Sequence, residues 1–249
     1  MLKVDHVTKY FNRSTPSEVF ALDHVSLEIQ GKEFLVIIGS NGSGKTTLLN
    51  LIAGNYFPDE GKISINDHDV TSKPDYARSK WIARVFQDPL KGTAPDLTLL
   101  DNFRLAALRT KRKKFQIGIN SKFRNEVREK ISTLNLGLEN KLDTMVGKLS
   151  GGQRQALTLL MAAMNQPKIL LLDEPTAALD PRSSEAVIQL SDKLIHDEKL
   201  TAILVTHNLK YAHGYGSRLV MMDKGKIIRD LSSIEKKSLT LLQLQTWFI

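Results

Sequence analysis

The stretch FLVIIGSNGSGKTTLLNLIAG, residues 34–54, joins a short apolar run to a glycine-rich loop and then to an apolar helical pattern. Residues 39–46 fit the pattern G-x-x-x-x-G-K-[ST] and have the strand, loop and helix order that this pattern needs. Glycines let the backbone curl so that its N–H groups face a phosphate, and the helix N-terminus adds a positive dipole end. A chance match in such a chain has a probability on the order of 1%. The stretch therefore predicts a phosphate-binding loop.

Two side chains of this loop have separate expected roles. Lys45 is placed to reach the β- and γ-phosphates of a nucleotide, and the Thr46 hydroxyl is placed to bind Mg²⁺. A loop of this kind does not by itself separate kinases, GTPases and ATPases. The expected nucleotide-binding residues are Gly39, Ser40, Asn41, Gly42, Ser43, Gly44, Lys45, Thr46 and Thr47.

A second glycine loop occurs in GKLSGGQRQA, residues 147–156. Ser150 and Gln153 have the spacing of a capping box, and an apolar helical pattern follows them. Gly151 and Gly152 would leave the N-terminus of that helix open to an anion, although a capped helix without a ligand fits the local pattern equally well. Because the first loop already holds its own nucleotide, a second anion site suggests a nucleotide held by another chain.

Polar residues follow two apolar runs further along the chain. In ILLLDEP, residues 169–175, the run ends in Asp173 and Glu174, whose side chains should point in opposite directions and serve different tasks. The first is placed to face the magnesium ion, and the second to approach a water in line with the γ-phosphate. The alternative is an acidic pair that merely ends a strand. His207 after TAILVT, and Gln87 in VFQDP, carry little weight alone, since a lone histidine at a strand end is more often structural.

Composition limits the class of protein. The chain has 249 residues, a formal net charge of +8 and no cysteine, so thiol catalysis, disulfides and thiolate metal sites are excluded. Its longest apolar runs are too short to cross a bilayer, and its N-terminus lacks the pattern of a secretion signal, so we expect a cytosolic chain. Much of the positive charge lies in residues 109–130, which form either a solvated helical surface or a contact with lipid headgroups or a partner.

The order of patterns predicts an α/β fold. Apolar and polar residues alternate in residues 2–11 and 19–29, which predicts antiparallel strands, and residues 60–67 resemble another edge strand. Residues 95–165 contain helical patterns and no convincing strand. Two more buried strands flank a helix at 181–198, as in a parallel sheet with crossover helices, and residues 218–230 read as a terminal hairpin.

Taken together, these motifs resemble the nucleotide-binding subunit of an ATP-binding cassette (ABC) transporter over essentially the full length. Residues 39–46 match the family's Walker A loop, Gln87 its Q-loop, LSGGQ (149–153) its signature and ILLLDEP its Walker B strand. AALD (177–180) matches the D-loop, with Ala177 where serine is commoner, and His207 matches the switch histidine. The resemblance implies one domain: a core of about residues 1–88 and 165–249, with a mostly parallel sheet and an N-terminal antiparallel subdomain, and an inserted helical subdomain of about 89–164.

The resemblance also implies roles for these residues, with ATP and Mg²⁺ as cofactors. Glu174 activates the attacking water, His207 contacts the γ-phosphate, and Thr46, Gln87 and Asp173 organise magnesium. An aromatic residue before the phosphate loop stacks on adenine; Tyr10 and Phe11 are the candidates, and the spacing favours Phe11. In this family the signature acts on the ATP of the partner cassette; the matching residues are Ser150, Gly151, Gly152 and Gln153, with Asp180 in the D-loop.

The partners implied are a second copy in a head-to-tail, ATP-bridged dimer and integral membrane permease subunits. A separate cassette chain is usual in bacterial uptake systems, which add an extracytoplasmic substrate-binding protein and place the ATPase peripherally on the cytoplasmic face of the inner membrane. The stretch VFQDPLKGTAPDLTLLDNFRLA, residues 85–106, resembles an uptake group associated with tryptophan- or tyrosine-like ligands.

Two alternatives remain open at this stage. Exporters, lipoprotein-release systems and cell-division complexes also use such an ATPase, although LDTMVGK, residues 142–148, does not resemble the loop that fused exporters carry before the signature. A soluble cassette ATPase acting on DNA or ribosomes would suit the positive charge. It would, however, carry a long coiled coil or a second cassette, which this chain lacks, so no nucleic-acid partner is expected.

Overall fold

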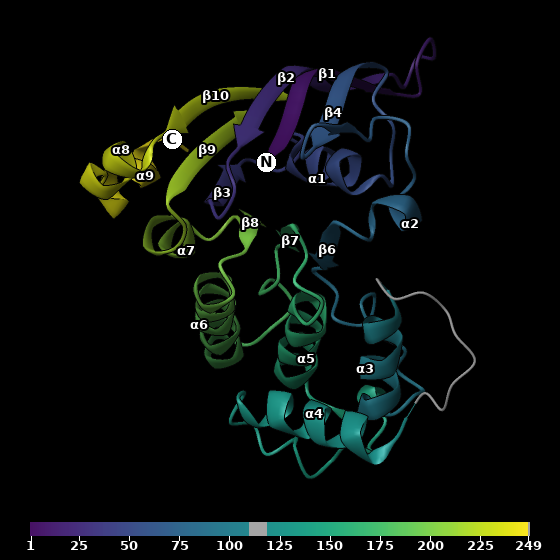
Figure 1. The fold of residues 1–249 in the computed structure, drawn as a ribbon. Helices are drawn as coiled ribbons and strands as arrows, with labels where there is room; N and C mark the ends of the chain where they lie inside the picture. The colour runs from purple at the N-terminus through teal and green to yellow at the C-terminus, as the bar shows by residue number, and fades with distance from the viewer. Residues whose placement is uncertain (110–118, 249) are drawn as a thin grey trace.

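The computed structural model describes residues 1–109 and 119–248. In these residues the strands form one antiparallel sheet of order β2-β1-β4-β5 and one mostly parallel sheet of order β10-β9-β3-β8-β7-β6 (Figure 1). Only the pair β9–β10 is antiparallel in the second sheet. The strands are β1 (Leu2–Phe11), β2 (Val19–Ile29), β3 (Phe34–Gly39), β4 (Glu60–Ile65), β5 (His68–Asp69), β6 (Ile82–Val85), β7 (Ile169–Asp173), β8 (Thr201–Val205), β9 (Arg218–Asp223) and β10 (Lys226–Leu231).

The central strand β3 separates two apolar cores, because its side chains alternate between the faces of the sheet. Leu35 and Ile37 pack on one face with α1 and the antiparallel sheet. Val36 and Ile38 pack on the other face with apolar residues of α5, α6 and α7. The helices are α1 (Lys45–Ala53), α2 (Asp75–Arg78), α3 (Leu99–Leu108), α4 (Ser121–Ser132), α5 (Gly151–Ala163), α6 (Pro181–Asp197), α7 (Leu209–Gly214), α8 (Ser233–Ser238) and α9 (Leu241–Thr246).

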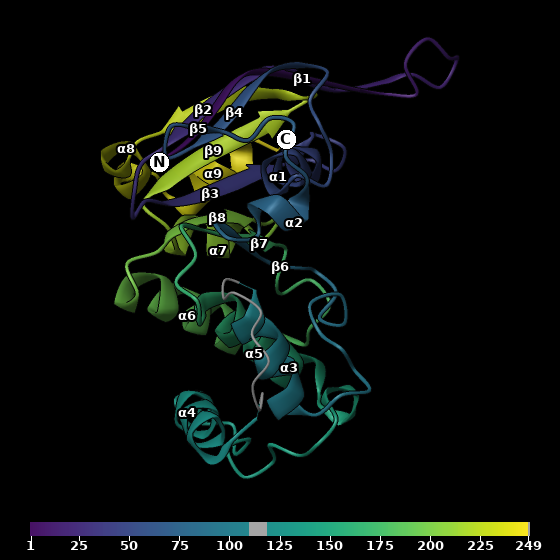
Figure 2. The ribbon, with the colours of Figure 1, turned by 45° about the vertical axis from the view of Figure 1, so that its right-hand side comes forward.

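A third core joins the helices of the inserted segment. Phe103 of α3, Ile131 of α4 and Leu157 of α5 belong to it. Helix α5 also places Leu159 and Ala162 in the core beneath the parallel sheet, so it belongs to both parts. Figures 1 and 2 show the antiparallel sheet at one end of the molecule and α4 at the other. We keep the division near residues 88 and 164 as a proposal, because α5, which ends beside the second boundary, packs on both sides of it.

Most of the sequence-based elements are confirmed, and one is corrected. The strand pair β1–β2, helix α6 and hairpin β9–β10 lie where the patterns predicted them. Strand β4 is not an edge strand, because Asn66 and Asp67 adopt left-handed backbone angles and return the chain as β5. Of the basic stretch 109–130, residues 110–118 lie outside the described residues. Within the described part, none of the helices combines the length and apolar character that a membrane span requires.

Candidate functional site

The glycine-rich loop connects β3 to α1, and its backbone is open at the helix N-terminus. Gly44 precedes α1 with a φ of 97°, and no side chain caps the helix there. A Cβ atom on Gly44 would lie 2.6 Å from the carbonyl oxygen of Ala21, so both the backbone angle and the space require glycine. The first N–H groups of α1 are therefore available to an anion.

Lys45 is buried, and its ammonium group is held by the loop itself. Its Nζ donates to the carbonyl oxygens of Gly39 and Ser40, each at 2.8 Å, and to Ser43 Oγ at 3.3 Å. Burial lowers the pKa of Lys45, and the nearby carboxylates of Glu174 and Asp173 oppose this shift. The lysine is therefore a preorganised cation in the loop that can exchange loop carbonyls for phosphate oxygens.

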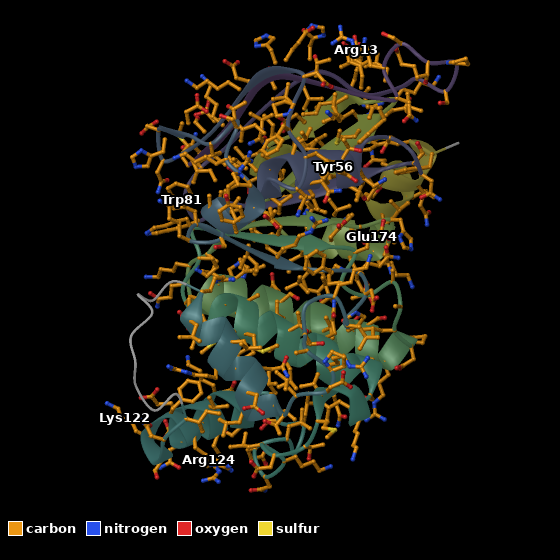
Figure 3. The ribbon with its side chains drawn as sticks, turned by 90° about the vertical axis from the view of Figure 1, so that its right-hand side faces the viewer. Arg13, Tyr56, Trp81, Lys122, Arg124 and Glu174 are labelled. Atoms are coloured by element: carbon orange, nitrogen blue, oxygen red, sulfur yellow. The ribbon has the colours of Figure 1, made fainter. Side chains whose placement is uncertain are left out.

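Replacing Lys45 by alanine should weaken ATP binding by about tenfold to a hundredfold, because a hydrogen bond to a charged phosphate contributes about 1.5–3 kcal/mol. Isothermal titration with Mg²⁺–ATP measures the change. Lys122→Ala is the matched control, since Lys122 is exposed on α4, far from the loop (Figure 3). Equal ATP affinity of the Lys45 variant and the control would contradict the assigned role.

The two carboxylates at the end of β7 have different surroundings. Asp173 is 7% exposed, and its Oδ2 accepts from Arg84 Nη2 at 2.5 Å. Glu174 adopts a left-handed backbone with a φ of 47°, and its Oε2 lies 3.0 Å from Nδ1 of His207. Figure 3 shows Glu174 between the parallel sheet and the helices beneath it. The two carboxylates thus have different partners: one is paired with a guanidinium, and the other with an imidazole.

A cavity of about 540 Å³ gathers the residues expected to bind magnesium. Thr46, Gln87 and Asp173 all line it. Together they offer a hydroxyl, an amide oxygen and a carboxylate, which are the oxygen ligands that Mg²⁺ prefers. The residues present therefore fit a magnesium ion bound together with nucleotide phosphates.

The two aromatic candidates for adenine lie in different surroundings. The Phe11 ring contacts the Tyr56 ring edge to face, with centroids 5.3 Å apart, and Tyr56 lines the cavity. The Tyr10 ring instead stacks on Phe20, with centroids 4.6 Å apart, beneath the guanidinium of Arg13. In Figure 3, Arg13 lies at the tip of the antiparallel sheet and Tyr56 lies closer to Glu174. This arrangement favours Phe11 over Tyr10.

Replacing Phe11 by alanine should weaken ATP binding by about fivefold to a hundredfold, because stacking of a base on an aromatic ring contributes about 1–3 kcal/mol. Tyr10→Ala is the control from the same strand and should change the affinity less than about twofold, within the range of a surface substitution. Titration with ATP and with inorganic triphosphate separates the contribution of the base to the affinity from that of the phosphates. An equal loss for both ligands in the Phe11 variant would argue against stacking.

The second glycine loop begins α5 with the predicted capping box. Ser150 Oγ accepts from the Gln153 N–H at 3.3 Å, and Gln153 Oε1 accepts from the Ser150 N–H at 3.1 Å. Nearby, Asp180 caps α6 by accepting from the N–H groups of Arg182 and Ser183. Ser150 and Gln153 are not among the residues that line the cavity around Thr46 in the described chain. The capping box leaves the first N–H groups of α5 at the surface, where Ser150 is exposed.

Sequence reasoning missed three polar side chains next to the phosphate loop. Arg84 of β6 donates through Nη1 to Asn50 Oδ1 at 2.7 Å and to Asn55 Oδ1 at 3.0 Å, in addition to its contact with Asp173. Arg84 could have been found from the sequence, because it is a charged residue inside the apolar run of β6 and a buried charge requires a partner. The asparagines carried no signal in the sequence.

A phosphate loop after one parallel strand, with a carboxylate pair at the end of another, defines a P-loop nucleotide-binding protein. The sequence pattern of the ABC transporter family matches residues 22–177. The tyrosine transport ATP-binding protein of Clostridioides difficile is 41% identical over 96% of this chain and 95% of its own length. The lipoprotein-releasing system ATP-binding protein LolD 2 of Chlorobium chlorochromatii is 30% identical over 96% of this chain and 98% of its own length.

Solved structures agree with these sequence matches. A dimeric bacterial ABC transporter cassette is 31% identical, with a TM-score of 0.80 over 94% of this chain and 99% of that chain. A dimeric post-hydrolysis cassette bound to ADP and phosphate is 32% identical, with a TM-score of 0.79 over 94% of this chain and 99% of that chain. The chain belongs to the ABC transporter family, and it is an ATP-binding subunit that hydrolyses ATP.

Proposed function

We propose that this chain powers the uptake of an aromatic amino-acid-like solute through membrane permease subunits. The observation that carries the proposal is its 41% identity, over almost the whole of both chains, to the tyrosine transport ATP-binding protein. The resemblance of residues 85–106 to the same uptake group supports it from within the sequence. The solute itself contacts other subunits, so the ATPase contributes the energy and not the selectivity.

Two copies pair head to tail in this proposal, with ATP between the phosphate loop of one copy and the signature loop of the other. The support is that Ser150 and Gln153 begin an exposed helix N-terminus suited to an anion, in a chain that already has one phosphate loop. One solved relative is dimeric in two structures. Because only the closed dimer offers both sets of contacts to one nucleotide, ATP shifts the equilibrium towards it, and hydrolysis removes that preference.

The proposed chemistry uses the phosphate loop, the residues that follow β7 and β8, and the groups that line the cavity. Lys45 and the loop N–H groups neutralise phosphate charge, and Glu174 accepts a proton from the attacking water. The imidazole of His207, which contacts Glu174, holds that carboxylate in position and turns towards the γ-phosphate when ATP is bound. Thr46, Gln87 and Asp173 would hold a magnesium ion, which supplies positive charge to the phosphates.

The permease is expected to dock beside the Gln87 segment. A groove of about 560 Å³ lies there between residues 91–94, helix α3 and helix α5. Its apolar walls include Leu105, Ala106 and Met161, and Leu105 is 53% exposed. A short helix of a permease loop would cover this apolar surface and respond to movement of the Gln87 segment. In this proposal the chain lies peripherally on the cytoplasmic face of the membrane, and an extracytoplasmic substrate-binding protein acts on the other side.

Purification of the tagged chain from membranes tests this proposal. We expect a permease to copurify, and we expect the reconstituted complex to hydrolyse ATP faster when a tyrosine- or tryptophan-loaded binding protein is added. The second candidate function is the release of lipoproteins from the membrane, because one relative belongs to a lipoprotein-releasing system. Stimulation by a lipoprotein and by no amino acid would favour that candidate, and copurification with nucleic acid alone would overturn transport.

A further inference from the structure

Arg84 is a charged side chain within the buried strand β6. Its strand neighbours Ala83 and Val85 are buried in the core beneath the sheet. The Arg84 side chain is only 10% exposed, as is the Asp173 side chain, and the two groups meet at 2.5 Å. The pair joins residues 89 positions apart, so it is a tertiary contact of the folded chain.

The guanidinium is held in place independently of Asp173. Asn50 of α1 and Asn55, which follows the helix, both accept from Nη1 of Arg84. The guanidinium also lies over the ring of Phe86, with its carbon 4.8 Å from the ring centroid. These contacts hold the positive charge beside the carboxylate in addition to the ion pair itself.

A buried carboxylate needs a positive partner, because removal from water destabilises an isolated charge strongly. Magnesium would provide that partner when Mg²⁺–ATP is bound. Without nucleotide, the Lys45 ammonium donates to loop oxygens, and the cation bonded directly to Asp173 is Arg84. The ion pair engages Oδ2 of Asp173, which leaves the second carboxylate oxygen for a metal ion or its bound water.

We propose that Arg84 is the built-in counter-ion of Asp173. It neutralises this carboxylate in the nucleotide-free protein and keeps its affinity for a free divalent cation low, so that the metal enters together with ATP. This role rests on the proposed function of Asp173 as a magnesium-organising residue. Arg84 is a positioning residue here, since it acts on the metal through Asp173.

Manganese binding to the nucleotide-free protein tests the proposal without relying on turnover. Electron paramagnetic resonance measures the concentration of free Mn²⁺ during a titration. The native protein is compared with the variants Arg84→Met, Arg84→Gln and Arg84→Lys. The two neutral variants should bind Mn²⁺ about tenfold tighter or more, because a positive charge a few ångströms from the metal is removed. Arg84→Lys keeps that charge and should bind Mn²⁺ as weakly as the native protein. If the methionine variant fails to fold, the glutamine variant gives the same comparison.

The double variant Arg84→Met/Asp173→Asn locates the effect at this carboxylate and should lose the gain in affinity. The proposal is overturned if the neutral variants bind Mn²⁺ no tighter than the native protein, or if neither neutral variant binds it detectably. It is also overturned if the gain in Mn²⁺ affinity persists without Asp173. The single variant Asp173→Asn, titrated with Mn²⁺–ATP, tests the metal role of Asp173 separately. Unchanged Mn²⁺–ATP affinity in that variant would refute the magnesium role of Asp173 itself. If that affinity is weakened but the neutral Arg84 variants bind free Mn²⁺ no tighter than the native protein, only the counter-ion role of Arg84 is refuted.

Discussion

Replacing Glu174 by glutamine should slow ATP hydrolysis by about 10²–10⁴-fold while leaving ATP binding intact, which is the range for removal of a general base. The substitution keeps the size of the side chain and a hydrogen-bond acceptor for His207, but the amide cannot take the proton of the attacking water. With hydrolysis blocked, the ATP-bridged dimer should accumulate, because nothing removes the γ-phosphate that holds it closed.

Two measurements on the Glu174 variant separate catalysis from folding. Phosphate release gives turnover, and size-exclusion chromatography with and without Mg²⁺–ATP gives the dimer fraction. Glu198→Gln is the matched control, because Glu198 is exposed at the C-terminal end of α6 and should retain normal turnover. A Glu174 variant that hydrolyses ATP normally, or that stays monomeric with ATP, would contradict its assignment.

The sequence predicted those parts of the fold that depend on local pattern. Alternation in β1 and β2, the left-handed Gly54 that ends α1 and the capping box of Ser150 and Gln153 are set by residues close in the chain. Strand β5 has two residues and helices α8 and α9 have six each, so they are too short to give a periodic signal. The position of α5 between two cores depends on contacts with distant segments, which no local pattern encodes.

The site shows the same division between local and distant information. Alternation predicted different surroundings for Asp173 and Glu174, but Glu174 lies beyond the end of β7 and owes its direction to a left-handed backbone that no pattern predicted. The choice between Tyr10 and Phe11 depends on Phe20 and Tyr56, which come from other elements. The ion pair of Arg84 and Asp173 depends on the parallel pairing of β6 with β7. Only the folded sheet brings the two residues together.

Replacing Ser150 by arginine should abolish hydrolysis while leaving ATP binding to the isolated chain unchanged. The substitution removes the hydroxyl that caps α5 and puts a bulky cation where the helix N-terminus should approach the partner's phosphates. Because Ser150 is exposed and its side chain bonds within α5, the phosphate loop should be undisturbed. Titration with ATP and phosphate release measure the two properties separately, and loss of ATP binding in the monomer would mean that the signature acts within its own chain.

Mixing equal amounts of the Ser150→Arg and Lys45→Ala proteins gives the sharper form of this test. Neither variant alone should hydrolyse ATP, because Lys45→Ala also removes the cation that neutralises phosphate charge during the reaction. In a mixed dimer, the intact phosphate loop of the Ser150 variant faces the intact signature loop of the Lys45 variant, so one complete site forms. Random pairing makes half of the dimers mixed, and each has one site of two, so about a quarter of the native rate should return. If both loops of a site came from the same chain, every site in the mixture would be defective. Activity would then stay absent at every mixing ratio, and the head-to-tail arrangement would be excluded.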